Sequence, residues 1–175
     1  MRRCEENDAM HSFHGERTKG VRPQLYFLGE KHVKMVEELI SYSAGDLSDL
    51  DALMHELSAT SFCDEHLLSN ALNDANVHVY VIRDIGHIIA TATLCVKHTL
   101  EFTVGDVESV VVSSRCRGGG YGKKLMRAVI EAARGVGVHH LSLTSHPGRV
   151  AANELYRGLG FERYETNCYK KILKR

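Results

Sequence analysis

Four glycines lie close together between two apolar segments, and such a stretch can bind an anion through its backbone. Residues 110–125 read VVVSSRCRGGGYGKKL, so an apolar run, a glycine-rich turn and a helix-like segment follow one another. Glycine takes positive φ angles without strain and lets the main chain approach a ligand closely. Because the first N–H groups of a helix lack partners and the helix dipole adds positive charge, we predict a phosphate or pyrophosphate site at this turn.

Other phosphate-binding patterns do not fit this turn. The Walker pattern fails because no Ser or Thr follows Lys124, and the dinucleotide fingerprint fails because Lys123 stands where its third glycine belongs. The RGG triplet is weak evidence for RNA binding in a chain whose formal net charge is zero. A mobile connector is the remaining alternative, although four glycines flanked by Arg117 and Lys123 argue against it.

The pattern that fits is R-x-x-G-x-G, made here by Arg117, Gly120 and Gly122 after an apolar run. A second block, ANELYRGLGF at residues 152–161, follows it in the chain. With both blocks in this order, the chain resembles the GNAT superfamily of acetyl-CoA-dependent N-acetyltransferases from about Gln24 to the C-terminus. The resemblance implies transfer of an acetyl group from acetyl-CoA to a primary amine of a small molecule or peptide, by direct attack in a ternary complex. A non-catalytic coenzyme A-binding sensor or interaction module is the alternative.

The second block supplies a candidate for protonating the leaving group. A helix would place Arg149, Asn153 and Tyr156 on one polar stripe, opposite the side that packs on the sheet. In the resembled family, an asparagine there binds the pantetheine arm and a tyrosine there donates to the departing thiolate. A phenol with a pKa of about 10 can donate while it stays neutral at pH 7. The alternative is a half-buried tyrosine whose hydroxyl only reaches solvent.

The resemblance therefore implies one set of cofactor-binding residues, spread over the apolar run, the turn and the second block. Backbone N–H groups of the apolar run would also stabilise the developing oxyanion, if this strand separates from its neighbour. The set comprises Val110, Val111, Val112, Arg117, Gly118, Gly119, Gly120, Tyr121, Gly122, Lys123, Asn153 and Tyr156.

An amine must lose a proton before it can attack a thioester, so the reaction also needs a base. Glu108 is the best-placed acid, and part of the resembled family has an acidic residue at this strand position. By the two-residue period of a strand, Glu108 shares a face with Val110 and Val112, and burial beside them would raise its pKa. Asp106 and Glu101 are in reserve. The alternative role for Glu108, an ion pair with a neighbouring basic side chain, fits the sequence equally well.

The acceptor amine is expected to bind between the N-terminal helices, the loop before Glu108 and the last strands. The sequence does not identify it, since the helices carry neither an acidic nor a basic cluster. Candidate acceptor residues are His55, Glu56, Phe62, Asp64, His66, Glu165, Asn167 and Tyr169.

The elements that must position these residues predict one α/β domain. The resemblance implies a GNAT-like, mixed and mostly antiparallel twisted sheet of six to seven strands, flanked by about four helices. Helices are predicted at Lys31–Ser43, at Asp46–Ala75 with a break at Ala59–Asp64, from the glycine turn to Gly135, and at Arg149–Leu159. Strands are predicted at Gln24–Leu28, Val77–Arg83, His87–Val96, Asp106–Ser114, Val138–Thr144, Phe161–Thr166 and Cys168–Leu173.

Composition limits the classes of function. In 175 residues with 43% apolar and 25% charged side chains, zero net charge argues against binding nucleic acid or a membrane by bulk charge. Five scattered cysteines indicate reduced thiols and a cytoplasmic location, and the eleven histidines form no metal-binding pattern. Residues 1–21 are expected to be a polar, disordered arm before a domain at 22–175. A homodimer is compatible with this domain size, but no sequence feature decides it.

Overall fold

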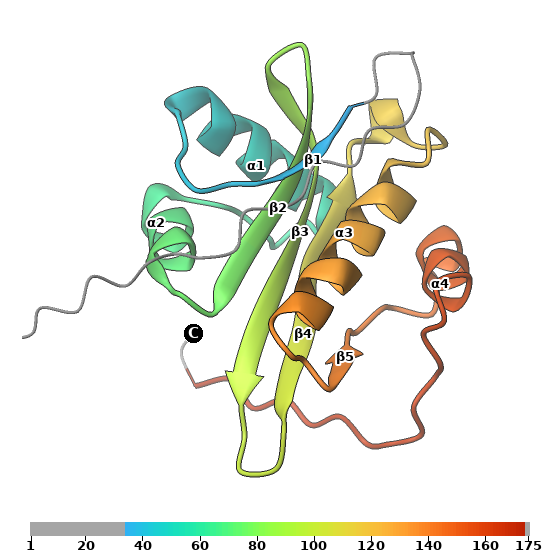
Figure 1. Ribbon diagram of the computed structural model, residues 1–175. Helices are drawn as coiled ribbons and strands as arrows, with labels where there is room; N and C mark the ends of the chain where they lie inside the picture. Colours follow the sequence, from blue (N-terminus) through green and yellow to red (C-terminus); the bar gives the residue numbers. More distant parts are fainter. Residues whose placement is uncertain (1–33, 174–175) are drawn as a thin grey trace, which may run out of the picture.

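A long hairpin forms the centre of the sheet in the computed structural model, which describes residues 34–173 (Figure 1). β2 (Val77–Asp84) and β3 (His87–His98) pair antiparallel along most of their length. The turn between them places Ile85 and Gly86 at φ angles of 47° and 84°, in the left-handed region typical of two-residue hairpin turns. The predicted hairpin is confirmed.

Three more strands complete a sheet of five strands within the described residues. β1 (Val36–Glu38) pairs with β2, β4 (Thr103–Val112) with β3, and β5 (His140–Ser142) with β4. The pairings β1–β2, β2–β3 and β3–β4 are antiparallel, whereas β4 and β5 pair in parallel. The sheet is therefore mixed, as expected, but the prediction of six to seven strands is wrong for this part of the chain.

Helices cover both faces of the sheet (Figure 1). α1 (Ala44–Leu57) and α2 (Glu65–Asn73) lie against one face, α3 (Tyr121–Gly135) lies against the other, and α4 (Val150–Arg157) follows β5. The expected number of helices, the break between α1 and α2 and the α/β class are confirmed. For these described residues, no helix is both long and apolar enough to cross a membrane.

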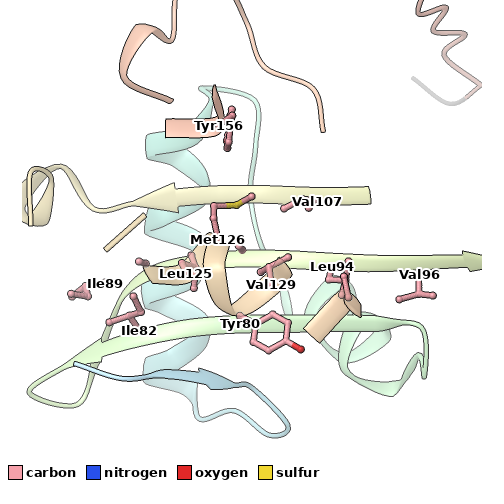
Figure 2. Close-up of a cluster of buried hydrophobic side chains, with 13 residues drawn as sticks. Tyr80, Ile82, Ile89, Leu94, Val96, Val107, Leu125, Met126, Val129 and Tyr156 are labelled. Atoms are coloured by element: carbon pink, nitrogen blue, oxygen red, sulfur yellow. The ribbon is translucent and has the colours of Figure 1, made fainter. Parts of the chain in front are cut away.

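Each face of the sheet has its own apolar core. On the α3 face, Leu125, Met126 and Val129 are fully buried against residues of β2, β3 and β4 (Figure 2). On the opposite face, leucines of α1 and α2 pack against the other side of the same strands. Because β2, β3 and β4 are buried on both sides, they are rich in β-branched and other apolar residues. This opposite core consists of Leu39, Leu50, Leu53, Met54, Leu68, Val79, Val81, Ile88 and Val111.

α1 is anchored at its first turn by a buried carboxylate. Ser43 is the N-cap, and its hydroxyl accepts from the Asp46 N–H at 3.2 Å, while Asp46 Oδ2 accepts from the Ser43 N–H at 2.9 Å. This capping box satisfies free helix N–H groups. Asp46 also forms an ion pair with Arg83 of β2. The Arg83 hydrogen bond lowers the pKa of Asp46 to about 2, so the carboxylate is charged in the folded protein at any ordinary pH.

A β-bulge divides β4 into two parts. Ser109 has a φ of 53°, and the register with β3 shifts between Thr91 and Thr93. Consequently, Val107 packs in the α3-side core whereas Val111, four residues later, packs in the core under α1 and α2. In a regular strand, these two side chains would point to the same face.

The predicted helix Lys31–Ser43 is wrong in its described part, which contains the strand β1. Val36 pairs with β2 and contacts the α3-side core, while Leu39 is buried in the core of the opposite face. Ile40 is exposed. The helical spacing of these residues was therefore misleading, because pairing with β2 places them on alternate sides. The predicted strand Gln24–Leu28 and the arm at 1–21 lie outside the described residues.

The predicted strand pair Phe161–Thr166 and Cys168–Leu173 is also wrong. Residues 162–173 are exposed and carry no strand, and Figure 1 shows this segment as a loop outside the sheet. The neighbouring β5 has only three residues and offers few backbone groups for further pairing. A hollow of about 390 Å³ consequently stays open between α3, β5 and Phe161.

Candidate active site

The glycine turn leads directly into α3 and leaves open space in front of its backbone. Gly118 and Gly120 have φ angles of 82° and 75°, and a Cβ at either position would meet no atom within 4 Å. Gly120 is the N-cap of α3 and provides no side chain to occupy the free N–H groups of the first turn. These features suit a bound anion, because the free N–H groups and the helix dipole both attract negative charge.

The other two glycines of the turn allow close packing. A Cβ at Gly119 would lie 2.6 Å from the ring of Tyr121, and one at Gly122 would lie 3.2 Å from Leu155 of α4. Gly122 also faces Val112, whose Cγ2 would be 3.7 Å away. The turn is therefore held tightly against β4 and α4, which fixes the direction of its N–H groups.

Lysines surround the turn. Lys34 Nζ and Lys124 Nζ lie 5.3 Å and 5.7 Å from the centre of the Tyr121 ring, within the range of cation–π contacts. Lys123 is exposed in the first turn of α3. Lys34 is ion-paired with Asp84, so Lys123 and Lys124 supply the positive charge at the start of α3 in a chain that is neutral as a whole.

Arg117 lies just before the glycines and is held from two sides. Its Nε donates to the Val112 carbonyl at 3.1 Å, and its Nη2 donates to Glu56 Oε2 at 3.2 Å. Glu56 belongs to the last turn of α1 and was expected among acceptor-binding residues, but it contacts the turn instead. No short-range pattern reveals this contact, because the partners are 61 residues apart.

β4 loses its neighbour on one side near the expected cofactor residues. Pairing with β5 covers only Val104 to Asp106. Ser113 N–H donates to the Ile89 carbonyl of β3, so the N–H of Val112, one residue earlier, points away from β3 by strand alternation. Among the described residues, no strand pairs with Val110–Val112 on that side, as the oxyanion prediction requires.

Tyr156 is buried and belongs to the α3-side core. Only 9% of its surface is exposed, and its ring meets Phe161 edge to face with centres 6.1 Å apart. Figure 2 shows it at one end of the cluster, apart from Ile82 and Tyr80. Burial raises the pKa of Tyr156, and the charge of Arg149 opposes this only in part. The phenol therefore stays protonated at neutral pH, although it does not lie on the exposed polar stripe that the sequence predicted.

Asn153 stabilises the loop that precedes α4. Its Nδ2 donates to the carbonyl oxygens of His146 and Arg149, both at 3.0 Å. Arg149 in turn donates from Nη2 to the Leu57 carbonyl of α1 at 2.7 Å. In the same loop, Ser145 Oγ is buried and has no hydrogen-bond partner among the described residues. An unpaired polar atom beside the second block is consistent with a polar ligand group binding there.

The position of Glu108 differs from the prediction in two respects. It is exposed, so the apolar burial expected for it is wrong. The bulge at Ser109 also separates it from Val110 and Val112, which contact the α3-side core, and places it on the face of Val111. Glu108 is paired with Thr93 in the ladder. Glu108 and Tyr156 therefore lie on opposite faces of the sheet.

The expected acceptor residues are only partly brought together. Phe62 is exposed between α1 and α2, while Glu165, Asn167 and Tyr169 lie on the exposed segment after α4. Asp64 is the N-cap of α2 and accepts from the Leu67 N–H, so its carboxylate has a structural role. In the described part of the chain, no three His, Cys, Asp or Glu side chains cluster in a way that could hold a metal ion.

The residues present fit a ligand that combines a pyrophosphate with an acyl thioester. The glycine turn offers the N–H groups and open space for the phosphates, and the unpaired edge of β4 lies between the turn and the β4–β5 junction.

Comparison with known proteins identifies the same region. The model of the acetyltransferase (GNAT) family matches residues 46–161, which include the glycine turn and the second block. Of the solved structures, one from Agrobacterium tumefaciens, provisionally named an acetyltransferase, has 24% identity and a TM-score of 0.69, covering 78% of this chain and 99% of its own. The glucosamine-6-phosphate N-acetyltransferase of Arabidopsis thaliana has 20% identity and a TM-score of 0.64, with coverage of 78% and 96%.

A third similar structure is the aminoglycoside 6′-N-acetyltransferase of Acinetobacter haemolyticus, with 20% identity, a TM-score of 0.62, and coverage of 78% of this chain and 98% of that one. These likenesses support the fold, and the family match extends over most of the described residues. The chain therefore belongs to the acetyltransferase (GNAT) family, whose acetyl donor is acetyl-CoA.

Proposed function

We propose that this protein transfers the acetyl group of acetyl-CoA to a primary amine of a small molecule or peptide, by direct attack in a ternary complex. The observation that carries the proposal is the placement of Glu108 and Tyr156 on opposite faces of the sheet, with Glu108 two residues beyond the last pairing of β4 with β5. A base and an acid on opposite sides of the reacting carbonyl suit a displacement, because nucleophile and leaving group occupy different sides of that carbon.

The donor binds on the side of α3 and α4. The N–H groups at the start of α3 hold the pyrophosphate, with Arg117 and Lys123 adding positive charge. In the segment Val110–Val112, outward N–H groups such as that of Val112 hold the pantetheine arm and then the oxygen of the acetyl group as it becomes negative. The buried Tyr156 phenol, which stays protonated, donates to the departing sulfur.

The acceptor approaches from the side of α1 and α2. On this face, Glu108 has the half-buried Thr93 and Cys95 as neighbours, whereas Leu94 between them is fully buried on the other face. Burial raises the pKa of the Cys95 thiol, and the negative charge of Glu108 adds to the rise. Glu108 accepts the amine proton here, directly or through water.

The proposed acceptor class is supported by the names of similar proteins. The Arabidopsis structure is named for glucosamine-6-phosphate and the Acinetobacter structure for the 6′-amine of aminoglycosides, so both are named for amino-sugar acceptors. The open, polar surroundings of Glu108 admit such a molecule or a peptide N-terminus.

The test is an acetylation screen with the purified protein and acetyl-CoA. Amino sugars, aminoglycosides, polyamines and peptides are offered, and both thiol release and acetylated product are measured. We expect one class to be acetylated with stoichiometric release of coenzyme A. Coenzyme A that fails to bind in calorimetry, or release of thiol without any acetylated amine, would reject the proposal.

A further inference from the structure

We propose that Glu56 is a positioning residue for the pyrophosphate turn, which it organises through Arg117 and the preceding serines. The inference rests on the proposed binding of a coenzyme A thioester at that turn. It concerns a residue of α1, which lies outside both sequence blocks that define the cofactor site.

Four donors converge on the Glu56 carboxylate. Oε2 accepts from the Ser114 N–H at 2.7 Å and from Arg117 Nη2 at 3.2 Å. Oε1 accepts from the hydroxyls of Ser113 and Ser114 at 3.3 Å and 3.4 Å. The carboxylate thus ties together the short 3-10 turn η1 (Ser114–Cys116) and the arginine that follows it.

These contacts fix the plane of the Arg117 guanidinium. Nε is held by the Val112 carbonyl of β4 at 3.1 Å and Nη2 by Glu56 of α1. A guanidinium has five N–H donors, so three are still free to donate to a phosphate. Without Glu56, this long side chain, more than half exposed, would sample many rotamers, and binding would then have to overcome the entropy of ordering it.

The last turn of α1 also holds the second block. The Leu57 carbonyl, next to Glu56, accepts from Arg149 Nη2 at 2.7 Å. One turn of α1 therefore contacts both the residues before the glycines and the start of α4. A carboxylate in this position acts on geometry, because its charge alone opposes the approach of an anion.

Because Glu56 is negatively charged, the two explanations predict opposite changes in coenzyme A affinity when it is removed. If Glu56 were only a nearby negative charge, Glu56→Ala would tighten the binding of coenzyme A. If it positions Arg117, the same change weakens binding, by about fivefold to tenfold for one mispositioned charge-assisted hydrogen bond. Glu56→Gln keeps one acceptor oxygen and should give an intermediate loss.

The dissociation constant of coenzyme A is measured by calorimetry for the wild type, Glu56→Ala, Glu56→Gln and the control Glu65→Ala. Glu65 is an exposed carboxylate on α2, so its removal changes the net charge equally and should leave binding unchanged. With the best acceptor from the screen, Glu56→Ala should raise KM for acetyl-CoA but leave kcat/KM for acetyl-pantetheine, which lacks the pyrophosphate, within twofold.

Three results would overturn the inference. The first is unchanged or tighter coenzyme A binding by a folded Glu56→Ala protein. The second is an equal loss of kcat/KM with acetyl-CoA and with acetyl-pantetheine. The third is a Glu56→Ala effect on coenzyme A binding that is as large in an Arg117→Ala background as in the wild type. Should Glu56→Ala not fold, Glu56→Gln carries the same comparison of the two donors. Wild-type protein that binds no coenzyme A would instead reject the proposed function, and this inference with it.

Discussion

Replacing Gly120 with alanine tests whether the turn at the start of α3 holds the donor. At a φ of 75°, an alanine is strained, and we expect a loss of about 1 kcal/mol in the free energy of unfolding. For a domain of this size, the melting temperature should fall by about 3 °C. The new methyl group meets no protein atom, so it occupies the open space in front of the turn. It should push a phosphate away from at least one N–H group, which raises the dissociation constant of coenzyme A about tenfold.

Gly86 in the β2–β3 turn provides a matched control. It has a φ of 84°, a Cβ there would also meet no atom within 4 Å, and it lies in a different turn of the chain. Gly86→Ala should therefore cost about the same stability and leave coenzyme A binding intact. Thermal melts with increasing coenzyme A measure both effects, because a ligand of the folded state raises its melting temperature. Equal affinities of the two variants would refute the assignment of the phosphate site to this turn.

Three further predictions concern protons. Tyr156→Phe should lower kcat at least tenfold while coenzyme A affinity changes little, in steady-state kinetics and calorimetry; unchanged turnover removes the phenol from the mechanism. Glu108→Gln should abolish or shift the acid limb of the pH–rate profile, and a limb that stays in place identifies another base. The pKa of Asp46 is lowered from 3.8 to about 2 by folding, so its ion pair stabilises the protein above pH 4 and loses this effect as pH falls toward 2. Asp46→Asn should remove about 2 kcal/mol of stability at pH 7 in denaturant melts and flatten its dependence on acid; equal acid sensitivity of both proteins would contradict the assignment.

The sequence predicted best those features that depend on short-range signals. Glycine at positions 118 and 120 indicates positive φ angles. The helical spacing of the apolar residues that follow predicts α3 with its buried Leu125. The pair Ile85-Gly86 between two β-branched runs likewise predicts the hairpin. In each case, local conformational preference and the later burial agree.

Other features depend on contacts that no short window contains. Ser109 is not a residue type that signals positive φ, so the bulge could not be predicted from the sequence. The sheet face of Glu108 was therefore predicted wrongly as well. The side-chain contacts of Glu56 join residues about 60 positions apart. Val36 fits a helix by spacing alone, and only pairing with β2 makes it part of a strand.

The extra residue in β4 changes which positions of this strand face the acceptor side and which face the donor side. Before Ser109, even-numbered positions such as 106 and 108 look toward α1 and α2; after it, odd-numbered positions such as 111 do. A mutant library aimed at acceptor preference should therefore vary even-numbered positions before Ser109 and odd-numbered positions after it. A library that varied even-numbered positions along the whole strand would change donor-side residues after Ser109, and its variants would lose cofactor affinity.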